Sequence, residues 1–398
     1  MHFINIILYI IFILIVWTYF GYPISLLIIS RLKKNNDNNI RYFRKLFITI
    51  IIPTYNEELM IEKKLVNCLD LIYDFDKIQI IIIDSASTDR TKSIVENFIN
   101  KNRSYAIKLI NETTRNGKAA AVNKALEICT GEIVLITDAN ALMNKSCLIN
   151  LVKHFEFASV GGVEGKYLLK SLSNNLISEG ESLFRKLENW IKEKESKIDS
   201  TIGMVGEISC FRRNLIDKLD ENIIAEDFDM SIRIRKKGYR IIHEPNATVW
   251  EYSPSTFKDE ITQKKRRVIG TIKVLIKHFR ILFNPKYGYY GVYILPSHSG
   301  IRLMSPFLLI VFFILSLISF YNYSNIFIQS IVFLEFLIII VEIMNLFIKL
   351  LKIKIDNRIL ISIHYFLLSQ LIVFLAWIDI FRKKYSVKWD PISSSRGI

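Results

Sequence analysis

The sequence predicts an α/β domain with a parallel sheet, held between apolar segments that are long enough to cross a membrane. From Leu46 onward, short apolar runs alternate with helical patterns, which is the order of a parallel sheet with right-handed crossovers. Hydrophobic residues make up 51% of the 398 residues, and the mean hydropathy of +0.27 is high for a wholly soluble protein. The apolar residues are concentrated at the two ends of the chain.

The N-terminal block, Phe3 to Ile29, exceeds the roughly 20 residues that a helix needs to cross a bilayer. No basic segment precedes it and no small-residue cleavage site follows, so we expect a retained anchor over 1–30. Three further blocks, at 303–321, 326–350 and 358–381, predict a helix bundle over 303–381 with a basic tail at 382–398. Glu335 and Glu342 are costly in lipid and are expected to face other helices or an aqueous crevice.

The net charge of +15 points to an anionic membrane surface, because no nucleic-acid-binding motif accompanies it. Basic residues follow the first apolar block and predict that the central region is cytoplasmic: Arg31, Lys33, Lys34, Arg41, Arg44 and Lys45. Four spans would put both termini outside, yet Arg382 and Lys383 follow the last block. A re-entrant or interfacial block would resolve this conflict, so the topology stays open.

The four cysteines, Cys68, Cys129, Cys147 and Cys210, are widely separated and match neither a zinc site nor a disulfide framework. We expect reduced thiols in the core. The polar, Asn-rich stretch 33–39 predicts a linker between the anchor and the α/β domain.

The α/β region divides into elements by its apolar periodicity. Strands are expected at 47–52, 78–83, 105–110 and 133–137, and helices at 57–69, 89–100 and 118–128. A further helix is expected from Asp227 to Lys237, ending at Gly238.

Each predicted strand is followed by polar residues. The four groups are Pro53-Thr-Tyr-Asn-Glu57-Glu58, Asp84-Ser-Ala-Ser-Thr-Asp89, Asn116-Gly117-Lys118 and Asp138-Ala-Asn140. Singly, each is explained as well by a helix cap or a turn. Together they surround one crevice at the carboxyl ends of parallel strands, where ligands bind in such sheets. A lysine at a helix N-terminus favours phosphate there, and the sequence has neither a dinucleotide fingerprint nor a P-loop.

In their order and spacing these motifs resemble family 2 glycosyltransferases, the membrane-bound inverting kind with a Rossmann-like GT-A fold. The resemblance covers about 46–280 and extends to Glu226-Asp227 and Gln263-Lys-Lys-Arg266. The flanking apolar segments are similar to those of its polysaccharide-synthase branch.

The resemblance implies a role for each matching position. The nucleotide-sugar would contact Pro53, Tyr55, Glu57, Asp84, Lys118 and Asp138, with Asp84 reading the uracil edge of a UDP-sugar. Asp138 and Asn140 would hold a divalent metal, Mg²⁺ or Mn²⁺. Asn140 stands where the family's Asp-x-Asp motif has its second acid, and a neutral oxygen binds such a cation less strongly.

Asp227 matches the family's catalytic base, which takes the proton of the acceptor hydroxyl. The alternative for Glu226-Asp227 is an acidic first turn of a helix. Glu226, Gln263 and Arg266 are assigned to the acceptor and diphosphate side. Arg267 replaces the Trp of the family's Gln-x-x-Arg-Trp motif, which counts against long-chain processivity.

A basic amphipathic helix on lipid headgroups is the other interpretation of this stretch; it accounts for Lys264 and Arg267 but not for Gln263. Gly203-Met-Val-Gly206 and Phe211-Arg212-Arg213 resemble the acceptor-side strand and loop of the family. The segment 281–302 is expected to be interfacial, with His298 either at the acceptor site or structural.

The expected function is transfer of a sugar from a nucleotide-sugar, UDP-linked by preference, to a hydroxyl of a lipid-linked or growing polysaccharide acceptor. This would occur at the plasma membrane, on its cytoplasmic side, for cell-surface or extracellular glycan synthesis. Two alternatives stay open. One is transfer to a polyprenyl phosphate, which needs no strong base; the other is a non-catalytic membrane scaffold.

Overall fold

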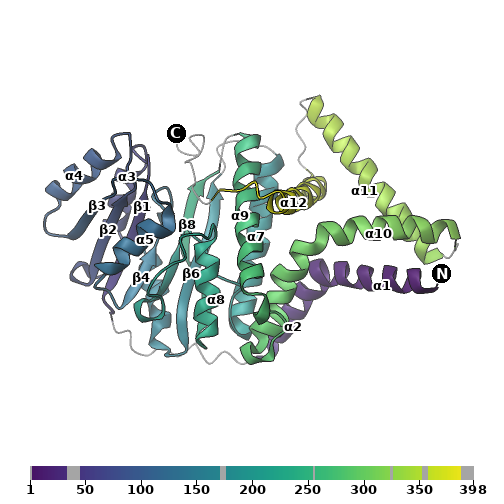
Figure 1. Ribbon diagram of the computed structural model, residues 1–398, viewed down its shortest axis with the longest axis horizontal. Helices are drawn as coiled ribbons and strands as arrows, with labels where there is room; N and C mark the ends of the chain where they lie inside the picture. The colour runs from purple at the N-terminus through teal and green to yellow at the C-terminus, as the bar shows by residue number, and fades with distance from the viewer. Residues whose placement is uncertain are drawn as a thin grey trace.

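The computed structural model describes residues 2–33, 45–170, 176–253, 256–322, 326–351 and 357–386 (Figure 1). Nearly all of the predicted linker, the basic residues Lys34, Arg41 and Arg44, and the tail from 387 onward lie outside these residues. An α/β domain forms one side of the molecule, and α1 and α10 extend away from it side by side.

The described residues form one eight-stranded mixed sheet with the order β3-β2-β1-β4-β7-β6-β8-β5. Its strands are β1 (Ile48–Thr54), β2 (Ile78–Asp84), β3 (Ala106–Asn111), β4 (Ile133–Ile136), β5 (Leu142–Met143), β6 (Val160–Lys170), β7 (Ser209–Arg212) and β8 (Arg240–Tyr252). The first four pair in parallel, as predicted. The other half is mixed: β7 runs antiparallel to β4 and β6, while β6 and β8 are parallel.

Side chains alternate between the two faces of the sheet, so the Ile-rich strands build two cores. Ile50 packs with α3 (Ile61–Leu69), α4 (Thr91–Lys101) and α6 (Cys147–Val152). Ile51 packs with α5 (Lys118–Glu127) and α8 (Glu226–Lys236) on the other face. All four cysteines are free, as expected; Cys129 is half-buried and the others are buried.

The first helix of the α/β domain, α3, begins at Ile61, later than the predicted start at 57. The preceding turn has Asn56 at φ 52°, and the backbone N–H of Glu57 donates to Thr91 Oγ1 at 2.8 Å. The turn after β1 is therefore bonded to the start of α4, and this contact holds Asn56 and Glu57 outside the helix.

Two long amphipathic helices, α7 (Leu176–Ile198) and α9 (Phe257–Lys277), lie between the sheet and the apolar helices (Figure 1). Four apolar helices are long enough to cross a membrane within the described chain: Phe3–Leu32, Tyr290–Asn322, Ile326–Ile348 and Arg358–Phe381. The second begins at Tyr290 with π-helical turns that continue into α10 (Arg302–Asn322), inside the stretch expected to be interfacial.

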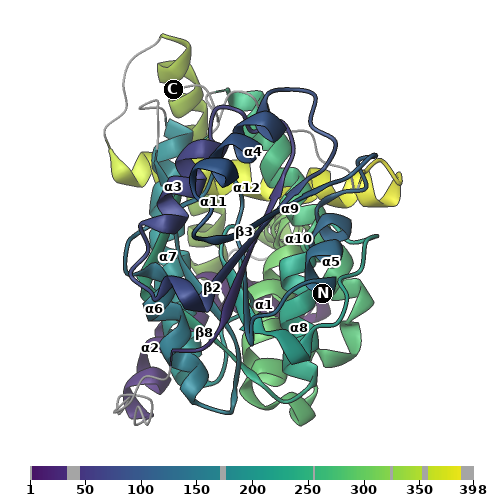
Figure 2. The same ribbon diagram turned by 90° about the vertical axis from the view of Figure 1, so that its left-hand side faces the viewer.

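The apolar helices do not all share one direction. Figure 1 shows α12 (Arg358–Phe381) end-on, whereas α1 (His2–Val16) and α10 run across the view. In Figure 2, turned by 90°, α12 runs across the view instead, so it lies crosswise to α1 and α10. Along its length α12 contacts α7 and α9.

The two glutamates of α11 (Ile326–Leu350) pair with neighbouring helices. Glu335 accepts from Ser316 Oγ at 2.6 Å, and Glu342 lies 2.7 Å from Nδ1 of His364 in α12. Both acids therefore face other helices, as expected of charged groups at membrane depth.

Candidate active site

The carboxyl ends of β1, β2 and β4 meet at one edge of the sheet, beside a cavity of about 770 Å³. Its wall includes Tyr55, Glu57, Lys118 and Asp138 from the sheet edge and Glu226, Asp227, Gln263 and Arg266 from α8 and α9. It continues between α7 and the apolar helices, past Arg302 and Gln370. One space therefore joins the polar edge of the sheet to the apolar helices.

At the β2 end, Asp84 is buried and does not line the cavity, whereas the neighbouring Ser85 does. Asp84 Oδ2 accepts from the backbone N–H of Ser87 at 3.1 Å. Its Oδ1 is also buried, and among the described residues no group donates to it. A buried carboxylate oxygen without a donor is costly, and a ligand N–H would satisfy it.

The rings of Tyr55 and Pro53 line the cavity at the carboxyl end of β1. The guanidinium of Arg115 lies 4.0 Å from the ring centroid of Tyr55, and Pro53 lies in the wall beside them. Arg115 was not singled out in the sequence, because it stands in a loop between a strand and a turn.

Lys118 stands at the centre of the acidic groups. Its Nζ lies 2.6 Å from Asp138 Oδ1 and 3.3 Å from Glu226 Oε1, and it donates to the Gly206 carbonyl at 3.2 Å. Burial alone would lower the pKa of Lys118, but Asp138 and Glu226 outweigh burial and raise it. The lysine therefore stays protonated and offsets the charge of the surrounding carboxylates.

Asp227 lies in the first turn of α8, with Oδ1 accepting from the backbone N–H of Phe228 at 2.9 Å. Burial, and then the neighbouring Glu226, raises the pKa of Asp227 to about 7. A carboxyl group with a pKa in this range can accept a proton at neutral pH.

The turn after β4 is held from beneath by a buried lysine. Lys64 Nζ donates to Thr137 Oγ1 at 2.8 Å and to the carbonyl of Ala141. Asp138 and Asn140 lie between these two anchor points, and both line the cavity. Lys64 therefore fixes the backbone of the turn that carries Asp138 and Asn140.

Asp138 and Asn140 bring one carboxylate and one neutral oxygen to the cavity. Among the described residues, no group of three or more His, Cys, Asp or Glu side chains is arranged to hold a metal. Protein sites for Mg²⁺ often use one or two oxygen ligands and leave the rest to substrate phosphates. The two residues fit a site of that kind.

In α9, Gln263, Arg266 and Arg267 share one face and line the cavity. Burial lowers the pKa of Arg266, although Glu226 opposes this. Lys264 pairs with Glu181 at 2.9 Å and Arg267 with Glu207 at 2.7 Å. These contacts are with acidic side chains of the domain, so they do not support the lipid-headgroup interpretation of this stretch.

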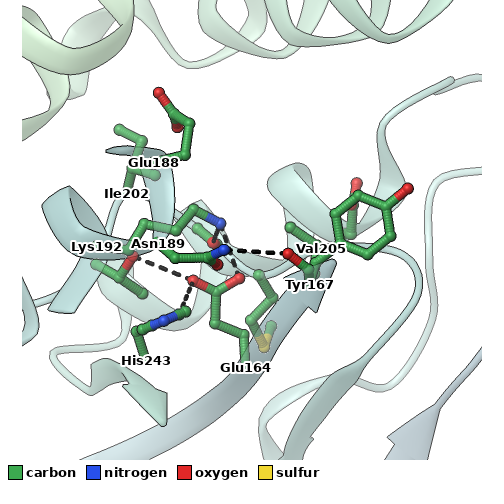
Figure 3. A network of polar contacts seen from close by, with 12 residues as sticks. Glu164, Tyr167, Glu188, Asn189, Lys192, Ile202, Val205 and His243 are labelled. Carbon is green, nitrogen blue, oxygen red and sulfur yellow. Dashed lines mark hydrogen bonds and ion pairs between the residues drawn. The ribbon is translucent and has the colours of Figure 1, made fainter. Parts of the chain in front are cut away.

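The Gly-rich segment 203–207 lines the cavity and contacts Lys118 through the Gly206 carbonyl. Lys192 of α7 donates to the Gly203 carbonyl at 3.2 Å and to Glu164 Oε2 at 2.8 Å, and His243 Nδ1 lies 3.1 Å from Glu164 Oε1 (Figure 3). A Cβ on Gly203 would lie 2.8 Å from the Phe228 ring. This buried network fixes the segment against α7, β6 and α8.

Arg212 and Arg213 are not part of this site. Arg212 pairs with Ile133, at the start of β4 and thus at the end opposite Asp138. Its guanidinium donates to the carbonyls of Val160, Phe155 and Phe157. The segment Phe211-Arg212-Arg213, which resembles an acceptor-side loop in sequence, does not line the cavity; Arg212 instead holds three backbone carbonyls of the segment 155–160.

The membrane side of the cavity carries a second polar cluster. His298 Nδ1 lies 2.5 Å from Glu195 Oε1, its Nε2 lies 3.1 Å from Glu188, and Arg302 lies 2.5 Å from Glu188. Tyr22 donates to Glu195 at 2.6 Å. His298 thus connects α7 to the apolar helices and also lines the cavity.

Two acids of the cavity region were missed in the sequence, Glu207 and Glu251. Both contact Arg267, and Glu251 also accepts from Asn140 Nδ2 at 3.0 Å. Burial and then Glu207 raise the pKa of Glu251 to about 7, with Arg267 and Tyr167 opposing the rise. Glu251 lies in β8, 111 positions beyond Asn140, and only strand pairing brings them together.

Comparison with known proteins agrees with this geometry. Residues 49–220 match the model of Glycosyl transferase family 2. The probable glycosyltransferase YdaM of Bacillus subtilis is 29% identical over 251 residues, and the poly-beta-1,6-N-acetyl-D-glucosamine synthase of Staphylococcus aureus is 27% identical over 236. The alignments cover 60% and 58% of this chain, and the chain spans 58% and 56% of those relatives.

Among solved structures, the mannosyltransferase PcManGT of Pyrobaculum calidifontis, in complex with GDP-Man and Mn²⁺, matches at 26% identity with a TM-score of 0.72. The match covers 95% of this chain and 100% of that one. The expected GT-A fold is therefore confirmed. Residues 49–220 thus form a domain that matches Glycosyl transferase family 2, and this GT-A domain is joined to helices that are long and apolar enough to cross a membrane.

Proposed function

We propose that this protein is a membrane-bound inverting glycosyltransferase that moves a sugar from a nucleotide-sugar to a hydroxyl of a lipid-linked or growing glycan. The observation that carries this proposal is the single cavity that runs from Lys118 and Asp138 to the apolar helices at Arg302 and Gln370. A water-soluble donor can reach one end of it, and an acceptor attached to a lipid can reach the other.

A UDP-linked donor is supported by the environment of Asp84. Within the part of the chain that the structure describes, only Oδ1 of this carboxylate is without a donor, since Oδ2 accepts from Ser87. Uracil presents a single imino N–H, whereas guanine presents two adjacent donors that would engage both oxygens. We therefore expect UDP-sugars to bind in preference to GDP-sugars, although PcManGT was solved with GDP-Man.

In the reaction, the acceptor oxygen attacks C1 of the donor sugar while its proton passes to the Asp227 carboxylate. The bond from C1 to the diphosphate oxygen breaks, and its electron pair leaves with the nucleoside diphosphate. Lys118 and Arg266 stabilise the leaving charge. Asp138 and Asn140 would hold a Mg²⁺ or Mn²⁺ ion, which would supply further neutralisation of that charge.

The raised pKa of Asp227 supports a hydroxyl acceptor over a polyprenyl phosphate. A hydroxyl must lose its proton as it attacks, which requires a base of this kind. A phosphate acceptor is already ionised at neutral pH and would make no use of it.

The test is nucleotide release by purified, detergent-solubilised protein with UDP-, GDP- and dTDP-sugars, under Mg²⁺, Mn²⁺ or chelator. We expect a UDP-sugar to be turned over, and Asp227→Asn to lose turnover by roughly 10²-fold or more while UDP binding by calorimetry is kept. Asp229→Asn is the matched control, because Asp229 lies in the same helix but pairs with His278 and Lys277.

Two outcomes would contradict the proposal. Turnover with added polyprenyl phosphate that survives Asp227→Asn but not Asp138→Ala would favour the phosphate acceptor. Absence of both nucleotide release and nucleotide binding would favour the scaffold.

A further inference from the structure

Glu251 lies one hydrogen bond behind the candidate cation site. The antiparallel pairing of β5 with β8 sets Leu142 beside Trp250, and this brings the turn before β5 to Glu251. Asn140 Nδ2 donates to Glu251 Oε2 at 3.0 Å, and the Glu251 side chain is only 5% exposed. A buried acid therefore contacts one of the two residues that would hold the metal.

This contact decides which end of the Asn140 amide faces the cavity. Asn140 Nδ2 is the donor of this hydrogen bond, so the NH₂ end of the amide faces Glu251. The amide is planar, and its oxygen is consequently turned away from β8. Asn140 lines the cavity beside Asp138, so we infer that this oxygen serves there as a neutral ligand.

The other oxygen of Glu251 is held by two donors. Tyr167 of β6 donates to Oε1, and Nη2 of Arg267 lies 3.5 Å from it and 2.7 Å from Glu207. Both positions at which the chain departs from the family pattern, Asn140 and Arg267, thus contact the same carboxyl group.

The two departures compensate each other through Glu251. An aspartate in place of Asn140 would direct a second carboxylate at Glu251 with no donor between them, and like charges at such a distance are strongly unfavourable when buried. A tryptophan in place of Arg267 would leave Glu207 and Glu251 without their shared cation.

We propose that Glu251 is a positioning residue of the cation site, which orients the Asn140 oxygen toward the metal and is itself held by Arg267 and Tyr167. The proposal rests on the proposed function of the same site. It predicts that the cation is held by one charged side-chain oxygen, from Asp138, and one neutral one, from Asn140. The carboxylate of Glu251 does not touch the cation but is hydrogen-bonded to Asn140.

The test exchanges the amide of Asn140 and the carboxylate of Glu251. Binding of Mn²⁺, alone and with UDP, is measured by the electron paramagnetic resonance signal of the free ion for wild type, Asn140→Asp, Glu251→Gln and the double variant. In Glu251→Gln, Arg267 and Tyr167 keep the amide oxygen, so the NH₂ faces Asn140 and forces its amide to turn. We expect Mn²⁺ affinity to fall roughly tenfold or more.

Asn140→Asp alone is expected to melt at a lower temperature than wild type and to gain no Mn²⁺ affinity. In the double variant the amide NH₂ introduced by Glu251→Gln donates to the carboxylate introduced by Asn140→Asp. The melting temperature therefore recovers, and Mn²⁺ binds more tightly than to wild type. The control is Glu244→Gln, a buried glutamate of the same strand paired with Lys153 and His154. It should change stability without changing Mn²⁺ affinity.

Unchanged Mn²⁺ affinity in Glu251→Gln would overturn the proposal. Tighter binding by Asn140→Asp at an unchanged melting temperature would do so as well, because it would show that Glu251 exerts no constraint. Neither readout depends on turnover, so failure of this proposal is distinguishable from failure of the proposed enzymatic activity.

Discussion

At the scale of single residues, the site is a balance of charges around Lys118. This ammonium lies between Asp138 and Glu226, and its charge opposes the rise in the pKa of Asp227. Burial and Glu226 still dominate, so Asp227 titrates near neutrality. The same carboxyl group thus carries both the proposed reactivity and a cost in stability.

The pH dependence follows from that pKa. As a base, Asp227 must be ionised, so kcat/KM should fall as pH decreases through about 7, by about tenfold per pH unit below it. Initial rates of nucleotide release between pH 5 and 9 measure this. A flat profile through neutral pH would exclude Asp227 as the base.

The contribution of Asp227 to the stability of the fold changes with pH in the opposite direction to its contribution to kcat/KM. The folded pKa of Asp227 is raised above the usual 3.8, so the stability from this group is present below about 3.8 and is lost as pH rises through about 7. Asp227→Asn cannot ionise, and its melting temperature relative to wild type should rise from pH 5 to 8. An unchanged difference would contradict the burial of this charge.

At the scale of elements, the segment 203–207 depends on the buried pair of Lys192 and Glu164. Lys192→Met would leave Glu164 buried without its cation, a change that typically costs about 3–5 kcal/mol. We expect a clear drop in melting temperature, partly restored in Lys192→Met/Glu164→Gln. No rescue by the second substitution would show that the lysine acts through the Gly203 carbonyl instead.

β1, β2 and β4 were predictable because they are Ile-, Val- and Leu-rich runs buried on both faces, whereas β3 shows a shorter apolar pattern and is partly exposed. The later strands have no continuous apolar run that would mark them in the sequence. β6 contains Gly161, Gly162 and Gly165 and the buried Glu164, and β8 carries His243 and Glu251 inward. Their burial depends on partners far away in sequence.

The same difference separates the site residues. Asp138, Lys118 and Asp227 follow strand or helix ends and carry motif spacing, so they could be picked out from the sequence. Glu251 sits inside a strand with no local signal, and its importance arises only from strand pairing with the turn of Asn140.

At the scale of the whole molecule, the crosswise orientation of α12 offers a resolution of the conflict over the C-terminus (Figures 1 and 2). Its Asp379 pairs with Lys265 of α9 at 2.7 Å, and Trp377 donates to the Leu303 carbonyl at 2.9 Å. If α12 lies along the membrane surface, the chain crosses three times. Arg382 and Lys383 then lie on the side of the GT-A domain, as basic residues prefer.

This topology can be tested with cysteines placed in a Cys129→Ser background, since the other native cysteines are buried. In inverted plasma-membrane vesicles, a membrane-impermeant maleimide should label Ser386→Cys. Tyr321→Cys, at the far end of α10, is 90% exposed and should react only in right-side-out vesicles. Labelling of both positions from the same side would contradict a three-crossing chain.

The cavity that opens both to the sheet edge and between the apolar helices has a consequence for how substrate supply is measured. If the acceptor arrives by lateral diffusion within the bilayer, the quantity that sets its encounter rate is its number per unit area, while the donor counts per unit volume. Diluting the acceptor with inert lipid would then slow the enzyme even when every bulk concentration stays fixed. Local lipid composition would thereby govern glycan output as directly as the nucleotide-sugar pool does.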